Sequence, residues 1–492
     1  MLKNIRRISA AFLFIFITLL FLDISGSLHR WFGWLAKIQF WPAVLALNVG
    51  VIIALVLLTL LFGRIYCSVI CPLGVFQDII AALRRKKNRY AYSPEKRWLR
   101  YGVLVVFLVC CFAGINIVVS LLDPYSSYGR FVTHLFGPLY AAGNNLLASI
   151  AEHFNSYAFY SADVWLKSLP AVVVSAVIVL AVSLLAWLGG RTYCNTICPV
   201  GTMLSLLARF SLFRITFDKD KCRKCGKCSR NCKAACIDFK NMSVDYSRCV
   251  ACGNCLEHCN FDALHYCVPL KKRAVSTVSD DTVDKGKRSF LLWLGAATAM
   301  TTFSQTKKKV DGGLAAIEEK KEPTRATKIT PPGSVSARHF AQHCTACQLC
   351  ISECPNGVLR PDNGLENFLQ PRMSYERGFC RPECHRCSEV CPTGAIQPIT
   401  LEEKSSTQIG HAVWLKDNCI PVRDGVSCGN CERHCPTGAI EMVPLDEDDE
   451  NSPLIPTVNE IRCIGCGACE NVCPARPFPA IYIEGYEVHH LN

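Results

Sequence analysis

The sequence predicts an α-helical membrane domain followed by small α+β units organised around cysteine clusters. Three observations carry this prediction. Of its 492 residues, 50% are hydrophobic and only 19% are charged, whereas soluble proteins average about 25% charged residues. Long apolar runs occupy the first 200 residues, and most of the 32 cysteines occur in compact groups beyond them. The pattern excludes disordered and fibrous classes and a small disulfide-stapled secreted domain.

Four apolar runs predict four membrane spans. They cover residues 8–22, 40–62, 101–122 and 169–190. A helix that rises about 1.5 Å per residue needs about 20 residues to cross the hydrocarbon core, so the first run must include polar neighbours after Asp23. No small-residue cleavage site follows that run, so we expect a retained anchor rather than a removable signal peptide.

The positive charges predict the orientation of these spans. The N-terminus is basic, the loop 84–100 contains RRKKNR, and Arg191 follows the fourth run, so these three segments are expected in the cytoplasm. Segment 123–168 is then expected on the other side. Because much of the formal net charge of +13 flanks apolar runs, membrane topology explains it and no nucleic-acid partner is expected.

The membrane half contains an internal repeat. Residues 63–74 read GRIYCSVICPLG and residues 190–201 read GRTYCNTICPVG, which predicts a duplicated helical hairpin. Parallel repeats place equivalent segments around an axis along the membrane normal, so the four repeat cysteines are expected to converge near the cytoplasmic surface. They would form an additional redox or metal centre, or alternatively remain reduced structural thiols. They are Cys67, Cys71, Cys194 and Cys198. Cys110 and Cys111, within the third run, are expected to be small apolar packing residues.

Residues 211–270 contain two complete runs of the form Cys-x2-Cys-x2-Cys-x3-Cys. This is the spacing of bacterial ferredoxins, except that Lys233 and Asn260 replace the usual Pro. In such proteins the fourth Cys of each run binds the other cluster. We therefore predict one [4Fe–4S] cluster on Cys222, Cys225, Cys228 and Cys259, and a second on Cys249, Cys252, Cys255 and Cys232. Cys236 and Cys267 are left over, and Cys236 is an alternative to Cys232.

Residues 339–492 hold 16 cysteines in four further groups, two of which have a longer first gap. The groups are Cys344, Cys347, Cys350 and Cys354; Cys380, Cys384, Cys387 and Cys391; Cys419, Cys428, Cys431 and Cys435; and Cys463, Cys466, Cys469 and Cys473. With the first two runs they predict six [4Fe–4S] clusters. Zinc is the rival metal, but zinc sites usually combine well-separated Cys-x2-Cys pairs. The nearby His258, His343 and His434 are expected to be solvated neighbours rather than ligands. The acidic run 446–450 is expected to be a solvated loop, or alternatively a docking site for a basic partner.

Six clusters predict electron transfer, because the sequence contains no Ser–His–Asp signature, P-loop or Rossmann glycine fingerprint. Catalytic residues therefore remain unassigned, and enzymatic activity is left open. A redox sensor would need a signalling output domain, which the sequence does not suggest.

These motifs resemble two related families. Residues 1 to about 270 resemble the NapH-type membrane ferredoxins, which have four spans, two Cys-x3-Cys-Pro exits and a cytoplasmic two-cluster unit. Residues 285–492 resemble the MauM/NapG-type four-cluster proteins. The resemblance implies a four-span domain (1–210), a bacterial-type ferredoxin domain (211–270), a linker (271–338) and a four-cluster ferredoxin domain (339–492) in a multi-pass protein of the bacterial cytoplasmic membrane.

The linker contains a short apolar stretch, residues 287–304. Its start, Lys287, Arg288, Ser289, Phe290 and Leu291, resembles the core of a twin-arginine export signal with Lys in place of the first Arg. As a fifth span it would place residues 339–492 outside the cytoplasm. Lys307–Lys309 on the far side oppose the positive-inside rule. The alternative is an amphipathic or core helix, with everything after the fourth span remaining cytoplasmic.

The resemblance implies that electrons pass from a quinol, with menaquinol expected, through the clusters to an extracytoplasmic reductase or c-type cytochrome. Quinol oxidation needs a proton acceptor, for which Asp123, His134, Glu152 and His153 in the outer segment are candidates. The alternative is an electron donor for maturation or reductive servicing of a metalloenzyme. There a cytoplasmic reductant would enter at the 211–270 clusters, and electrons would cross at the repeat cysteines.

Overall fold

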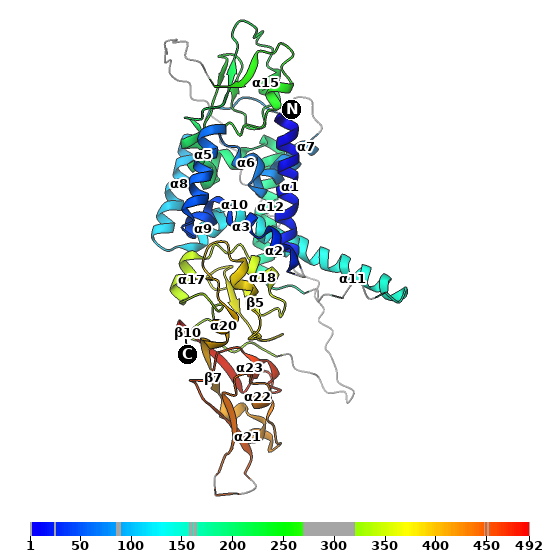
Figure 1. Ribbon diagram of the computed structural model, residues 1–492, viewed down its shortest axis with the longest axis vertical. Coiled ribbons are helices and arrows are strands. Elements are labelled where there is room, and N and C mark those ends of the chain that lie inside the picture. Colours follow the sequence, from blue (N-terminus) through cyan, green and yellow to red (C-terminus); the bar gives the residue numbers. More distant parts are fainter. Residues whose placement is uncertain are drawn as a thin grey trace, which may run out of the picture.

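The molecule has a central helical bundle with one cysteine-rich unit at each end of its long axis (Figure 1). The computed structural model describes residues 2–23, 26–84, 90–156, 161, 165–268, 320–446, 448–449 and 452–491. The unit at residues 211–268, which we call the upper unit, lies beside the N-terminus of the first helix. The lower unit, residues 320–491, lies against the opposite end of the bundle (Figure 1). The stretch 287–304 and Lys307–Lys309 lie outside the described residues.

The bundle contains helices of very different length. They are α1 (Leu2–Leu22), α2 (Ser27–Phe32), α3 (Trp34–Lys37), α4 (Phe40–Leu45), α5 (Val49–Phe62), α6 (Tyr66–Val69), α7 (Pro72–Leu83), α8 (Arg97–Phe112), α9 (Asn116–Leu122), α10 (Pro124–Phe131), the π-helix η1 (Val132–Phe136), α11 (Gly137–His153), α12 (Leu169–Gly189), α13 (Thr192–Thr196) and α14 (Pro199–Ala208). Two of the described helices, over Lys3–Leu22 and Leu169–Gly189, are long and apolar enough to cross a membrane.

The other two apolar runs are not continuous helices, which corrects the expectation of one helix in each. Run 40–62 is divided into α4 and α5, because Asn48 leaves the helix and its side chain caps the Val51 N–H at 3.3 Å. Run 101–122 is divided into α8 and α9 at Gly114, whose φ of 75° ends a helix. The remaining α5 and α8 have 14 and 16 residues, fewer than the approximately 20 that a single span needs.

The bundle has apolar side chains outside and charged side chains inside. Val106 on α8, Leu57 on α5 and Leu180 on α12 are 52–69% exposed, and further large apolar side chains of these helices are exposed beside them. In contrast, four arginines are among its largest fully buried side chains: Arg64, Arg100, Arg130 and Arg191. A water-soluble bundle has the opposite distribution.

Both end units are built from two-stranded antiparallel sheets and short helices. The upper unit contains β1 (Arg214–Phe217), α15 (Lys227–Arg230), β2 (Ile237–Asp238), β3 (Ser243–Val244), α16 (Asn254–Glu257) and β4 (Leu264–Cys267). β1 pairs with β4, with Arg214 opposite Cys267, and β2 pairs with β3. The two cysteine runs of this unit thus follow β1 and β3 along the chain.

The lower unit repeats this plan at larger size. It contains α17 (Ala337–His343), α18 (Leu349–Glu353), β5 (Leu359–Pro361), β6 (Pro371–Met373), α19 (Arg386–Val390), α20 (Leu401–Ser406), β7 (Thr407–Trp414), the 3-10 helix η2 (Lys416–Asn418), α21 (Ile420–Asp424), α22 (Asn430–Arg433), β8 (Ile440–Pro444), β9 (Leu454–Val458), α23 (Ala468–Val472) and β10 (Ile481–Leu491). β5 pairs with β6, β7 with β10 and β8 with β9, all antiparallel. One continuous core of buried side chains joins the bundle to both units.

Candidate metal centres

The four runs with regular spacing share one backbone conformation. The second residue after the first Cys is left-handed in each, at Lys224, Ala251, Ala346 and Gly465, with φ between 48° and 71°. The fourth residue is left-handed as well, at Gly226, Gly253, Gln348 and Gly467. This turn points backbone N–H groups at sulfur, as where Ala346 N donates to Cys344 Sγ at 3.5 Å. Such concave sets of N–H groups bind anions, including thiolate-ligated clusters.

The upper unit brings together the two ligand sets that the spacing predicts. Cys222, Cys225, Cys228 and Cys259 line one small pocket. Cys232 lies within electrostatic reach of Cys252 and Cys255 in the second run, and so does Cys249. We call these sets upper site 1 and upper site 2. Cys255 of site 2 is also within reach of Cys228 of site 1, so the two sites are adjacent.

Cys236 occupies the same corner of upper site 2 as Cys232. Their Sγ atoms are 3.5 Å apart, and Cys236 also hydrogen-bonds to Cys249. The hydrogen bond with Cys236 lowers the pKa of Cys232 below its usual value. Two thiols therefore compete for one ligand position, and the alternative assignment remains open. The other leftover residue, Cys267, lies on β4 with its Sγ 3.3 Å from Thr216 Oγ1.

In the lower unit, each pair of groups exchanges its fourth cysteine. Cys391 lies beside Cys344, Cys347 and Cys350, whereas Cys354 lies beside Cys380, Cys384 and Cys387. Likewise, Cys435 lies beside Cys463 and Cys466 of the last group, and Cys473 lies beside Cys419 and Cys431. We call these sets lower sites 1 to 4, defined by Cys344, Cys380, Cys463 and Cys419 in that order. Spacing alone left this exchange undecided.

The thiols suit a cluster better than a single ion. Burial raises the pKa of Cys347 and of Cys466 to about 12, so in the absence of metal they are protonated, and loading must release protons. Four thiolates around one zinc ion lie roughly 3.8 Å apart, given a Zn–S bond of about 2.3 Å. Among the described residues, no three cysteine Sγ atoms lie within 4.8 Å of one another. The wider spacing and four-thiol sets fit [4Fe–4S] clusters.

The repeat cysteines also converge inside the bundle. The four repeat cysteines are each only 4% exposed, and every pair among them is close enough for their charges to interact. They are Cys67, Cys71, Cys194 and Cys198. We call this set the bundle site. Cys71 and Cys198 immediately precede α7 and α14, and Gly201 N donates to Cys198 Sγ at 3.3 Å. The helix N-termini thus add positive potential to a buried four-thiol set.

Two buried arginines join the repeats at the bundle site. Arg64 of the first repeat donates to the Cys194 carbonyl at 3.0 Å, and Arg191 of the second donates to the Cys67 carbonyl at 2.5 Å. Each also lies beside the thiol of its own repeat: Arg64 Nη2 is 3.8 Å from Cys67 Sγ. An oxidised [4Fe–4S] cube with four thiolates has a net charge of about −2, which two guanidinium groups can offset.

The glycine that follows each Cys-Pro step leaves room for these arginines. A Cβ on Gly201 would overlap the Cys194 carbonyl and lie 2.7 Å from Arg64 Nη2. A Cβ on Gly74 would overlap the Cys67 carbonyl and lie 2.8 Å from Arg191 Nη1. The repeated Gly is therefore required by packing at both thiol loops.

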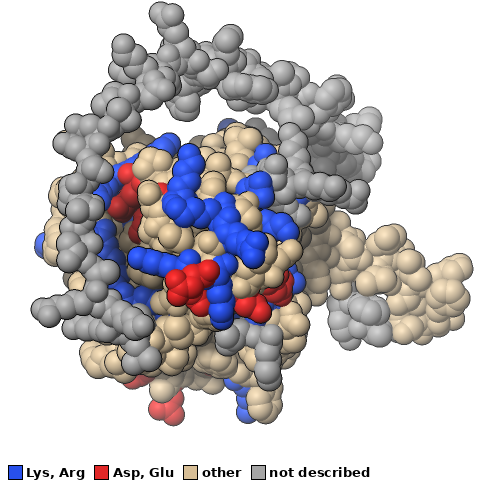
Figure 2. All heavy atoms as spheres, turned by 90° about the horizontal axis from the view of Figure 1, so that it is seen from above, with Lys and Arg blue, Asp and Glu red and all other residues tan. Residues whose placement is uncertain are grey.

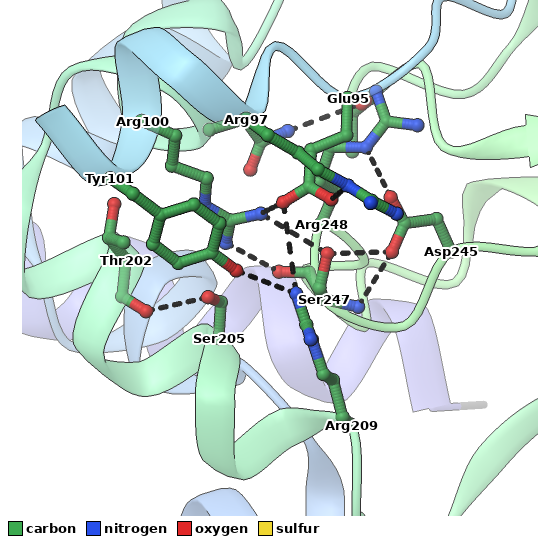
Figure 3. A network of polar contacts seen from close by, with 12 residues as sticks. Glu95, Arg97, Arg100, Tyr101, Thr202, Ser205, Arg209, Asp245, Ser247 and Arg248 are labelled. Carbon is green, nitrogen blue, oxygen red and sulfur yellow. Dashed lines mark hydrogen bonds and ion pairs between the residues drawn. The ribbon is translucent and has the colours of Figure 1, made fainter.

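The upper unit is fixed to the bundle beside upper site 2. Arg64 and Arg100 both donate to the Ser247 carbonyl, at 3.1 and 3.0 Å, two residues before Cys249. Figure 3 shows the surrounding network, in which Glu95 accepts from Arg100 at 2.7 Å and Asp245 accepts from Arg248 at 2.6 Å. These ion pairs hold the loop of upper site 2 against the bundle.

Lys233, which replaces the usual Pro after Cys232, has a clear role here. Its side chain pairs with Asp78 of α7, and its carbonyl accepts from Arg191 N at 2.8 Å. Asp78 also accepts from Arg191 Nε at 2.7 Å. A proline has no ammonium group, so the departure from the ferredoxin spacing is explained by docking to the bundle.

Asp123 lies between the bundle site and lower site 1. It caps α10 by accepting from Ser126 N at 2.9 Å, and it is 1% exposed. Tyr193 is close enough to Asp123 and to Cys198 for their charges to interact. Tyr125 is in the same relation to Asp123 and to Cys347. Arg130 donates to the Ala346 carbonyl at 3.1 Å, inside the loop of lower site 1. A buried polar layer therefore connects the two sites.

The seven thiol sets form one series along the molecule. Upper site 1 adjoins upper site 2, and Arg64 reaches both Cys249 of that site and Cys194 of the bundle site. Below the Asp123 layer, Cys350 reaches Cys387, Cys466 reaches Cys380, and Cys469 reaches Cys431. The lower sites therefore follow in the order 1 to 4.

Only one of the other three proton-acceptor candidates lies near a thiol set. His134 hydrogen-bonds to Gln348 of the lower unit and lines a cavity of about 180 Å³ with Asp23 and Lys167. Glu152 and His153 are exposed at the end of α11, which extends away from the bundle (Figure 1). The structure does not bring them to this cavity, which corrects that part of the expectation.

Further residues at this boundary have no signal in the sequence. Lys167 donates to the Ile351 carbonyl at 2.8 Å, next to Cys350. His29 Nδ1 lies 2.9 Å from Glu353 Oε1 of the lower unit and 3.9 Å from Asp23 Oδ2, and both carboxylates are buried. These contacts join the start of the bundle to α18.

The remaining residues noted in the sequence do not belong to the thiol sets. Cys110 is buried on α8 and Cys111 is half-buried, among apolar neighbours. His258 lines the pocket of upper site 1, and both His258 and His434 are exposed, with Nδ1 close to the carbonyl oxygen one helical turn earlier; His343 stacks on His339. In the acidic run 446–450, Asp446, Asp448 and Asp449 are exposed; the other two residues are outside the described ones.

Family models agree with this distribution of thiols. A 4Fe-4S binding domain matches residues 44–90 and 169–218, which contain the bundle site. Three 4Fe-4S dicluster domains match residues 245–358, 343–396 and 426–476. [4Fe–4S]-binding domains are therefore present, and the chain carries several such clusters.

Among curated proteins, the chain is similar to the methylamine utilization ferredoxin-type protein MauM of Methylobacillus flagellatus, with 32% identity over 33% of this chain and 70% of that protein. It is 29% identical to the ferredoxin-type protein NapG of Escherichia coli, over 37% of this chain and 86% of NapG. It is 26% identical to NapF of Escherichia coli, over 36% and 99% of the two chains. No solved structure matches. These similarities and the cluster domains show that the chain belongs to the MauM/NapG family of ferredoxin-type electron-transfer proteins.

Proposed function

We propose that this protein is a membrane-anchored relay that takes electrons from a quinol, with menaquinol expected, and passes them to an extracytoplasmic reductase or c-type cytochrome. The observation that carries the proposal is the single series of thiol sets, which extends from one end of the molecule to the other. A series of adjacent clusters conducts electrons, and seven adjacent four-thiol sets would hold such a series.

The bundle provides the membrane anchor in this proposal. Its exposed apolar faces and buried arginines suit a lipid environment. The short helices α5 and α8 complete their crossings together with α4 and α9, as the NapH-like membrane half would require. The upper unit, described as far as residue 268, and the lower unit, described from residue 320, lie at opposite ends of the bundle, which supports an additional crossing and an extracytoplasmic lower unit (Figure 1).

The cavity beside lower site 1 is the proposed quinol site. It lies between α1, α11 and residues 165–167, and Ser352, between Cys350 and Cys354, forms part of its wall. His134 and Asp23 are the groups placed to accept protons from a quinol hydroxyl there. Electrons leaving at this position would enter lower site 1 and continue through lower sites 2, 3 and 4.

The bundle site is proposed to hold a seventh [4Fe–4S] cluster, for a total of seven with the six predicted in the two units. The charge balance with Arg64 and Arg191 supports this, as does the 4Fe-4S domain that spans both repeats. Its chemistry is one-electron transfer between the upper sites and lower site 1.

Anaerobic reduction by menaquinol tests the quinol proposal. The full chain in lipid nanodiscs is mixed with menaquinol, and cluster reduction is followed by visible bleaching and EPR. We expect Ala141→Trp, which fills the cavity, to slow reduction at least tenfold. Ala142→Trp, the next residue on α11 and not part of the cavity wall, is the matched control. Wild-type protein that dithionite reduces fully but menaquinol does not would exclude quinol oxidation.

A second candidate function is favoured by the bundle site itself. Quinol oxidation at the cavity would not need the two upper sites or the crossing. Their continuity with lower site 1 supports transfer of electrons from a cytoplasmic reductant to a metalloenzyme outside. Full reduction of lower sites by a low-potential donor confined to the upper side of sealed vesicles would support this function.

A further inference from the structure

Upper site 1 has the only exposed cysteine of the chain. Of the 32 cysteines, all of which lie in the described residues, Cys225 alone is exposed. It is in the first thiol set of the series, at the end of the molecule farthest from the lower unit (Figure 1). The cysteines of the other sets are buried or half-buried. Upper site 1 is therefore the place where an electron can enter or leave from solution at the upper end.

A dense basic surface surrounds this exposed thiol. Residues 219–230 read KDKCRKCGKCSR, with six basic residues and one acidic residue. All six basic side chains are exposed: Lys219, Lys221, Arg223, Lys224, Lys227 and Arg230. Figure 2 looks down on this end of the molecule and shows Lys and Arg side chains gathered there.

Most of these charges are not neutralised within the molecule. Across the described part of the chain, only Lys221 of the six has a carboxylate within ion-pair distance, Asp218 at 3.6 Å. Arg230 donates to the Cys225 carbonyl at 3.0 Å, and Arg223 lies over the Phe261 ring at 5.4 Å. These two contacts hold cationic groups beside the site without removing their charge. The surface thus keeps a positive field directed at solvent.

The opposite end of the series has the opposite charge. Around lower site 4 and the tip of the lower unit, the exposed acidic residues are Asp417, Asp424, Glu432, Glu441, Asp446, Asp448 and Asp449. The exposed basic residues in residues 416–449 are Lys416, Arg423 and Arg433. An acidic protein is therefore attracted to the upper end and repelled from the lower one.

We propose that the basic surface around Cys225 docks a small acidic one-electron carrier protein, with a flavin or an iron–sulfur centre. Cys222, Cys225, Cys228 and Cys259 would hold a [4Fe–4S] cluster, which would accept the single electron that the reduced carrier gives up. No bond forms or breaks. The inference depends on the proposed electron relay but not on quinol oxidation, and it gives the upper sites a defined electron source.

Stopped-flow kinetics test the docking. The full chain in nanodiscs is mixed anaerobically with a reduced plant-type [2Fe–2S] ferredoxin of net negative charge, and bleaching of the clusters is recorded. We expect the second-order rate to fall at least tenfold between 0.05 and 0.5 M NaCl, as steered association does. A rate that is constant or rises with salt would refute the proposal without the use of any variant.

Charge-reversal variants locate the surface. Lys219→Glu/Lys227→Glu is expected to slow reduction by the ferredoxin at least tenfold, and Lys219→Arg/Lys227→Arg is expected to retain the wild-type rate. The matched control, Lys321→Glu/Arg338→Glu, makes the same charge change at exposed residues of the lower unit. Iron content and dithionite reduction verify that the clusters are intact. If the clusters themselves are absent, dithionite bleaching is lost as well.

Binding to vesicles distinguishes a membrane role for the same surface. Detergent-solubilised protein is mixed with phosphatidylglycerol vesicles, and sedimentation is compared among the same variants. Loss of vesicle binding in Lys219→Glu/Lys227→Glu with an unchanged rate of reduction by ferredoxin would overturn the proposal and assign the surface to anionic lipid.

Discussion

Replacing Arg64 should shift the reduction potential of the bundle site in a direction and by an amount that its position fixes. Arg64 is fully buried, and its Nη2 is 3.8 Å from Cys67 Sγ, so its charge lies roughly 6 Å from the centre of a cluster bound there. At an effective dielectric constant of about 20, one charge at about 6 Å contributes about 3 kcal/mol. For a one-electron couple this corresponds to roughly 120 mV. Because reduction adds negative charge, loss of the cation disfavours the reduced state.

We therefore expect Arg64→Gln to lower the potential of one cluster by roughly 100 mV, and Arg64→Lys to lower it much less. The assay is an EPR-monitored redox titration of the full chain. Arg209→Gln is the control, because in the described part of the chain Arg209 contacts the Tyr101 hydroxyl and Glu95 near the bundle surface and no thiol. A set of potentials that is the same in wild type and Arg64→Gln, with iron content unchanged, would refute both the electrostatic reasoning and a cluster at this position.

Three further predictions concern ligand exchange, packing and pH. Cys391 and Cys344 belong to the same ligand set, so either alanine variant should lose one cluster, about four iron atoms. The double variant Cys391→Ala/Cys344→Ala should lose no more iron than either single variant in an iron analysis. Additive loss of iron would contradict the exchange of fourth cysteines. Gly201→Ala should destabilise the bundle by about 2 kcal/mol, measured as a lower thermal unfolding midpoint, while Gly102→Ala, with open space around its Cβ, should not. Burial lowers the pKa of His489 to about 4. In the unfolded chain the imidazole of His489 is protonated below about pH 6.5, whereas in the folded protein it stays neutral. The free energy of unfolding should therefore fall by about 2 kcal/mol between about pH 7 and pH 5, as measured by denaturant titration. His489→Gln should make this pH dependence weaker.

The cysteine runs made the end units predictable because their spacing is set by cluster geometry. The two upper ligand sets and the convergence of the repeat cysteines follow from local spacing and from duplication. The arginines of the bundle site could also have been found, since Arg64 and Arg191 occupy the same position in the two repeats. Conservation of position within a repeat was a signal as clear as that of the cysteines.

Other features depend on contacts between distant segments, which periodicity does not reveal. Hydropathy does not report that Asn48 and Gly114 interrupt two apolar runs, because a single cap or left-handed residue hardly changes an average. Exchange of Cys354 and Cys391 depends on how two loops fold over each other. The contact of Lys167 with the loop of lower site 1 joins residues 184 positions apart and has no local signature.

The crossed arginines of the bundle site also constrain the order of assembly. Neither hairpin can complete its own thiol loop, because the carbonyl of each first cysteine is bound by the arginine of the other hairpin. The first hairpin leaves the ribosome more than a hundred residues before the second. Until then, its two thiols and Arg64 lack their partners in the second hairpin. The four thiols of the bundle site can therefore act together only after both hairpins have met, so this site must form after the second hairpin has folded.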